Sequence, residues 1–145
     1  MGSDAGYKHS ELTEAIIGVF YDVYNELGFG FVESVYRRAL RMALMEKGLR
    51  VEPEHPVTVF FRGEKVGDFR ADLVVNEVVL LELKTVEKII RAHEAQVINY
   101  LRSTTIELGL ILNFGPQPQI RRLVLDNSRK NTRAEGATSG SSDSE

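Results

Sequence analysis

The chain has 145 residues, of which 43% are hydrophobic and 27% charged, and its formal net charge is −3. These values predict one domain with a buried core, residues 1–126. No apolar run approaches the roughly 20 residues of a membrane helix, so no membrane partner is expected. The chain has no cysteine, which excludes disulfides and thiolate metal sites. With no secretory signal at the N-terminus, the cytoplasm is the expected compartment.

Two amphipathic helices are predicted in the first third of the chain. Residues 10–26 carry apolar side chains at helical spacing, with Ser10 as the expected N-cap, and Gly28-Phe29-Gly30 ends this helix. Residues 32–47 form the second helix, and Gly48 is its expected C′ residue.

The pattern then changes to that of strands. Residues 57–61, 66–75 and 78–84 are predicted strands, with turns at 62–65 and at Asn76-Glu77. The last pair of strands reads as a β-hairpin.

A helix is predicted at residues 87–101, a buried strand at 108–114 and an edge strand at 120–125. Residues 127–145 have no large apolar side chain and are expected to be a disordered tail. The order α-α-β-β-β-α-β-β predicts an α/β or α+β sheet with helices on its faces.

Charged residues gather at the open end of the predicted hairpin. Glu82 and Lys84 share one face of their strand, and the hairpin brings Asp72 across from them. Residues 78–81 are continuously apolar, which is typical of a strand buried on both faces, so charges at its end need a partner or a purpose. Carboxylates bind hard divalent cations, and the lysine can hold a water or a phosphate oxygen. The alternative is a simple surface ion pair.

The helix after the hairpin carries a second polar group. His93, Gln96 and Tyr100 lie on one face, where the amide and the hydroxyl can contact phosphate oxygens or orient a water. The alternatives are that Tyr100 packs in the core, that Gln96 caps a backbone group and that His93 is a surface or packing residue. Glu33, in the first turn of its helix, is also explained by the helix dipole alone.

Three motifs in this order resemble those of a known superfamily. Asp72 followed by Glu82-x-Lys84 resembles the signature of PD-(D/E)XK nucleases, although Arg70-Ala71 precedes Asp72 where the motif has proline. Gln96-x-x-x-Tyr100 is similar to the motif of the RecB-like branch. Gly30-x-x-Glu33-x-x-Tyr36 is similar to the signature of the GxxExxY family. The resemblance extends over residues 10–125.

The resemblance implies a restriction-endonuclease-like core, α-β-β-β-α-β, with a central mixed sheet flanked by helices and an extra N-terminal helix. It implies one or two Mg²⁺ or Mn²⁺ ions held by Asp72, Glu82, the carbonyl of Leu83 and Glu33. Lys84 would position the attacking water or stabilise developing charge. The expected catalytic residues are Glu33, Asp72, Glu82, Lys84, Gln96 and Tyr100.

The implied function is metal-dependent hydrolysis of phosphodiesters, in DNA before RNA. The net charge argues against a protein that coats nucleic acid, but it allows a basic rim around an acidic centre. Arg70, Arg91, Arg121 and Arg122 are candidates for backbone contacts, and a partner or a homodimer is expected to add specificity. The alternatives are a nucleic-acid-binding or regulatory module without useful turnover, and a structural domain with ion-paired acids. If three acids converge, Asp72→Asn is expected to preserve or raise metal-free stability.

Overall fold

The computed structural model describes residues 9–53 and 56–130. The helices are α1 (Ser10–Leu27), α2 (Glu33–Glu46), α3 (Arg91–Arg102) and the 3₁₀ turn η2 (Asn127–Arg129). The strands are β1 (Val51–Pro53), β2 (Pro56–Phe61), β3 (Glu64–Arg70), β4 (Leu73–Val75), β5 (Val79–Lys84), β6 (Leu108–Phe114) and β7 (Pro118–Val124). No helix in the described ranges is long and apolar enough to cross a membrane.

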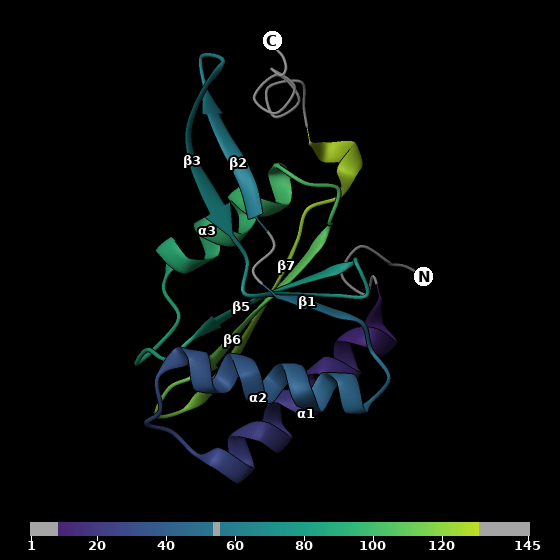
Figure 1. The fold of residues 1–145 in the computed structure, drawn as a ribbon, viewed down its shortest axis with the longest axis vertical. Coiled ribbons are helices and arrows are strands. Elements are labelled where there is room, and N and C mark those ends of the chain that lie inside the picture. The colour runs from purple at the N-terminus through teal and green to yellow at the C-terminus, as the bar shows by residue number, and fades with distance from the viewer. Residues whose placement is uncertain (1–8, 54–55, 131–145) are drawn as a thin grey trace.

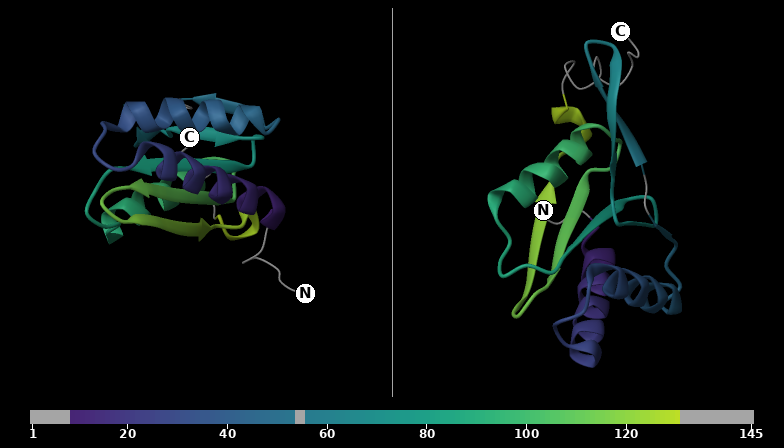
Figure 2. Two further views of the ribbon diagram at one scale, coloured as in Figure 1. Left: turned by 90° about the horizontal axis from the view of Figure 1, so that it is seen from below. Right: turned by 60° about the vertical axis from the view of Figure 1, so that its left-hand side comes forward.

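A central mixed sheet separates two layers. Its strand order is β1-β4-β5-β6-β7. β5 and β6 are parallel because α3 carries the chain across between them, while the other neighbours are antiparallel. α1 and α2 cover one face of the sheet, and α3 lies on the other together with the separate β2–β3 ribbon (Figures 1 and 2). This is the mixed sheet flanked by helices that the sequence predicts.

Strand alternation divides the core between the two faces. Leu81 and Leu83 of β5 pack with α1 and α2, whereas Leu80 packs with α3. Glu82 and Lys84 continue the row that Leu80 begins, so β5 directs both toward the α3 side. β6 is buried along its whole length, as its apolar sequence predicts.

The predicted β4–β5 hairpin is present, with Leu73 paired to Leu81. Asn76 and Glu77 have φ values of 51° and 63°, and the N–H of Val78 donates to the carbonyl of Val75 at 3.0 Å. Asn76 also exchanges two 2.8 Å hydrogen bonds with the backbone of Arg50. The turn is therefore tied to the residue that precedes β1, and this connection fixes the hairpin.

Two helix starts differ from the prediction. His9, with φ of 57°, is the N-cap of α1, so the prediction of Ser10 is wrong. The Oγ1 of Thr13 donates to the carbonyl of His9 at 2.9 Å. α3 begins at Arg91 and not at residue 87, because two backbone N–H groups before it bond to side chains of β6 and β7 and not within a helix.

The predicted strand 66–75 is two strands in two sheets. β3 belongs to the ribbon and β4 to the central sheet, and Ala71 and Asp72 form the connection. β1 was not predicted as a strand. The predicted tail begins with η2, and the Lys130 ammonium donates to the carbonyls of Thr104 and Ile106 at 2.7 and 2.8 Å. These four residues, 127–130, are therefore ordered, and residues 131–145 lie outside the described ranges.

Candidate active site

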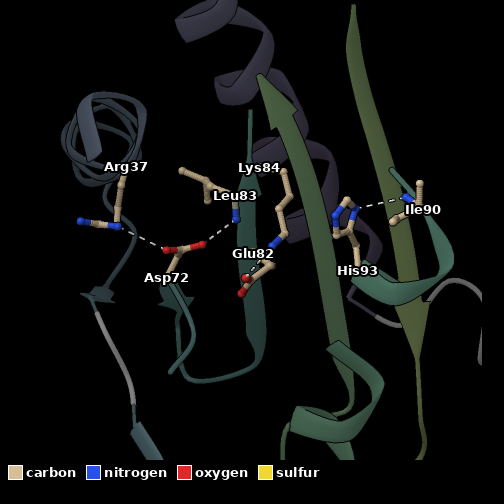
Figure 3. A network of polar contacts seen from close by, with 7 residues as sticks. All are labelled: Arg37, Asp72, Glu82, Leu83, Lys84, Ile90 and His93. Carbon is tan, nitrogen blue, oxygen red and sulfur yellow. Dashed lines mark hydrogen bonds and ion pairs between the residues drawn. The ribbon is translucent and has the colours of Figure 1, made fainter. Parts of the chain in front are cut away.

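The carboxylate of Asp72 is held where the chain enters the central sheet. Its Oδ2 accepts a hydrogen bond from the backbone N–H of Leu83 at 2.7 Å, and its Oδ1 lies 3.3 Å from the Nη1 of Arg37 on α2 (Figure 3). The Asp72 side chain is only 14% exposed. Both of its oxygens therefore have protein partners.

Glu82 and Lys84 lie beside Asp72 on the end of β5. The Nζ of Lys84 is 3.7 Å from the Oε2 of Glu82, and their side chains are 19% and 12% exposed respectively (Figure 3). The pairing of Leu73 with Leu81 brings the start of β4 next to this end of β5. The structure thus places two carboxylates and an ammonium group at one edge of the hairpin.

Glu33 approaches the same charges from the first turn of α2. The loop before it is held by Tyr36, whose buried hydroxyl donates to the carbonyl of Gly28 and accepts from the N–H of Phe31 at 3.3 Å. Gly30 has φ of 121°, a conformation that favours glycine. Gly30 and Tyr36 therefore shape the chain that delivers Glu33.

Two of the acids have raised pKa values. Burial first, and then the negative charge of Asp72, raises the pKa of Glu82 to about 7, against the opposing effect of Lys84. Burial and the charge of Asp72 also raise the pKa of Glu33, opposed by Lys84 and Arg37. Two cations thus partly offset three neighbouring carboxylates, which is an arrangement common at functional sites.

Two residues of α3 lie near this charge cluster. Burial, and then the charge of Glu82, raises the pKa of the Tyr100 hydroxyl far above its ordinary value. Burial and the charge of Lys84 lower the pKa of His93, whose Nδ1 accepts from the backbone N–H of Ile90 at 3.1 Å (Figure 3). His93 thus satisfies an orphan donor at the start of α3.

Gln96 is placed differently from Tyr100. Its side chain is exposed and lines a groove between α3 and the β2–β3 ribbon. The described ranges contain no hydrogen bond from Gln96 to the three acids. The arginines also separate: Arg121 pairs with Glu94 of α3 at 3.0 Å, whereas Arg122 donates to Thr13 of α1 at 3.0 Å, on the opposite face of β7.

The fold and sequence around this site resemble those of known proteins. A model of the PD-(D/E)XK nuclease superfamily matches residues 10–123. The chain belongs to this superfamily. A crystal structure of SSO0001 has 22% sequence identity and a TM-score of 0.52, over 95% of this chain and 69% of that chain. That likeness shows the fold alone, and no curated protein matches significantly. The predicted restriction-endonuclease-like fold is confirmed.

Nucleases of this superfamily generally use divalent metals, and the residues present fit such an ion. No group of three His, Cys, Asp or Glu side chains in the described part of the chain is arranged to hold a metal. Mg²⁺, however, usually takes one or two carboxylates and completes its shell with waters and substrate phosphates. Asp72 and Glu82 supply that minimum, and a cation would offset both the burial and the charge of Asp72 that raise the pKa of Glu82.

A polar network that the sequence did not reveal fixes the chain after Lys84. The amide of Asn113 is fully buried, and it accepts from the N–H of Val86 and donates to its carbonyl, both at 2.9 Å. The Oε1 of Gln119 accepts from the N–H of Ile89 at 3.0 Å. A Cβ at Gly115 would lie 1.9 Å from the carbonyl oxygen of Val86. The connection from β5 to α3 is thus held rigidly against β6 and β7.

The one signal for this network was the amide itself, a polar residue in the apolar run of β6. Arg37 was also missed, although it lies four residues after Glu33, a spacing that places the two on one face of α2.

Proposed function

We propose that the chain is a metal-dependent nuclease that hydrolyses phosphodiester bonds in DNA in preference to RNA, and a GxxExxY-type member of the RecB-like branch. The observation that supports this most is the group formed by Asp72, Glu82 and Lys84, whose charges affect one another at the end of the β4–β5 hairpin.

Each residue has a proposed role that follows from its position. Asp72 and Glu82, with Glu33 and the carbonyl of Leu83, would hold Mg²⁺ or Mn²⁺, which when bound lowers the pKa of a water and neutralises phosphate charge. Lys84, 3.7 Å from Glu82, can donate to the attacking water or to a phosphate oxygen. Arg37 and the Leu83 N–H keep the Asp72 carboxylate in place.

A second function is supported by a specific observation. Both oxygens of Asp72 are already bonded within the protein, which suits a module that binds or regulates nucleic acid without useful turnover. In that case the acids and cations would be mutually satisfied, and the domain would bind its partner through other surfaces.

A cleavage assay separates the two. The full chain is incubated with single- and double-stranded DNA and RNA, in Mg²⁺, in Mn²⁺ and in chelator. The nuclease proposal expects metal-dependent cleavage that Asp72→Asn, Glu82→Gln and Lys84→Ala each reduce by at least about a hundredfold. Glu77→Gln is the matched control, since Glu77 lies at the turn of the same hairpin and pairs with exposed Arg50. Cleavage that persists in all three variants would refute the mechanism, and its absence under every condition would favour the binding module.

A further inference from the structure

A groove of about 550 Å³ lies between α3 and the β2–β3 ribbon. The ribbon projects from the body beside α3 in Figures 1 and 2. Phe69 of β3 lines the groove, and its ring is 5.3 Å from that of Tyr100. After burial, the charge of Glu82 also raises the pKa of Tyr100. The Tyr100 side chain therefore lies between the groove residue Phe69 and the acids.

The ribbon gives the groove an apolar wall. Val57 is paired with Phe69 and Val59 with Gly67, so all four positions share one face of the ribbon. Val59 is 42% exposed, although it is a β-branched apolar residue in a strand. This face therefore has apolar surface that the fold does not cover.

Gly67 keeps part of this wall open. Its φ lies outside the positive range, so neither a turn nor the neighbouring bulge requires glycine here. A Cβ at this position would meet nothing within 4 Å. Glycine inside a strand weakens it and often marks a place where a ligand approaches closely.

α3 gives the groove a polar wall. Gln96, Asn99 and Arg102 follow one another at three-residue spacing along one side of the helix. The Nη1 of Arg102 donates to the Oδ1 of Asn99 at 3.1 Å. This bond uses the Asn99 amide oxygen and does not involve its N–H groups. Asp68, which also lines the groove, is offset by Lys65 at 3.6 Å.

We propose that this groove binds an unpaired nucleotide of the nucleic-acid substrate. A nucleobase has flat apolar faces and a polar edge, which match the valine and phenylalanine wall and the facing amide and guanidinium groups. A duplex cannot present such a face, because its bases are stacked and paired. The inference rests on the proposed function and deepens it: the substrate is single-stranded or has an unpaired nucleotide.

The test measures binding without cleavage. Fluorescence anisotropy in EDTA compares a short labelled single-stranded DNA with the duplex of the same sequence. The wild type should bind the single strand more tightly. Gly67→Val, which fills the groove, should weaken single-strand binding by about tenfold, in the range of one lost stacked base. Thr58→Ser, a ribbon change outside the groove lining that keeps the hydroxyl donating to Asp68, should leave it unchanged.

A second variant keeps the test decisive if Gly67→Val does not fold. Gln96→Leu changes an exposed helix residue and should also weaken single-strand binding. Thermal melts verify that each variant is folded. The inference is overturned if the wild type does not prefer the single strand, or if a folded Gly67→Val and Gln96→Leu both bind it like the wild type. The two proposals fail on different results. If the wild type cleaves but the groove variants bind single strands normally, only the groove proposal is refuted. If binding depends on the groove but no cleavage occurs, only the nuclease proposal is refuted.

Discussion

Glu82→Gln should make the metal-free protein more resistant to alkaline conditions than the wild type. Burial and the charge of Asp72 raise the pKa of Glu82 from 4.5 to about 7 in the folded state. The folded state therefore holds this proton more tightly than the unfolded chain. The stabilisation is fully present below about pH 4.5 and is lost as the pH rises through about 7.

The size of the effect follows from the same shift. A displacement from 4.5 to about 7 corresponds to roughly 3 kcal/mol, because one pKa unit is worth about 1.4 kcal/mol. This is an upper value, since rearrangement around a partly solvated carboxylate reduces it. In a domain of this size, it corresponds to a change in melting temperature of roughly 5 to 15 °C.

The assay is a series of thermal melts in EDTA from pH 5 to pH 8. Comparing the variant with the wild type at each pH removes the constant cost of exchanging a carboxylate for an amide. The difference in unfolding free energy should shift in favour of Glu82→Gln by up to roughly 2.5 kcal/mol across this range. Glu77→Gln, at the exposed turn, should show no such trend. Mn²⁺ or Mg²⁺ should stabilise the wild type at pH 8, by roughly 2.7 kcal/mol at a hundred times its dissociation constant. A pH-independent difference would refute the reasoning that burial and the charge of Asp72 raise the pKa of Glu82.

Three further predictions concern the cation next to Asp72, the Tyr100 hydroxyl and the C-terminal segment. Arg37→Gln should lower metal-free stability at pH 8 by about 1 kcal/mol, because only Lys84 then offsets the acids, whereas Arg38→Gln next to it should have little effect. Tyr100→Phe should reduce cleavage while the loss of unfolding free energy stays near 1 kcal/mol, the cost of one hydroxyl; destabilisation with normal specific activity would make the hydroxyl structural. Truncation after Lys130 should preserve folding and cleavage, but truncation after Asp126 should lower the melting temperature, because it removes the bonds of Lys130 to Thr104 and Ile106.

The hairpin revises the expectation for Asp72→Asn. The sequence predicted that Asp72→Asn would preserve or raise metal-free stability by relieving repulsion among the acids. In the structure Asp72 accepts from the Leu83 N–H and pairs with Arg37, so the substitution removes a stabilising pair together with the repulsion. At Glu82, which lies 3.7 Å from Lys84, neutralisation relieves the cost of burial and then the repulsion by Asp72.

The elements that the sequence predicts well are those with a local cause. β6 has the predicted bounds because a short apolar run followed by Gly115-Pro116 favours a buried strand. The hairpin turn follows from Asn76, which tolerates a positive φ. The switch between sheets at Ala71 and Asp72 has no such signature, because period-two alternation runs through it without a break.

Long-range contacts explain the remaining differences. α3 begins late because the N–H of Ile89 bonds to Gln119, thirty residues away, and no local pattern encodes that choice. The site shows the same division. Periodicity brought Glu82 and Lys84 to one face, but the contact of Arg37 with Asp72 depends on how α2 packs on the sheet.

The GxxExxY motif gains a physical explanation from this arrangement. Its three named residues need not all face the substrate. Gly30 allows a positive φ of 121°, and the Tyr36 hydroxyl, fully buried, bonds to both ends of the loop at Gly28 and Phe31. Of the three, Glu33 is the residue whose pKa is affected, after burial, by the charges of Asp72 and Lys84. The glycine and the tyrosine act as a clamp that sets where α2 begins, and the position of that first turn determines whether a third carboxylate reaches the hairpin acids.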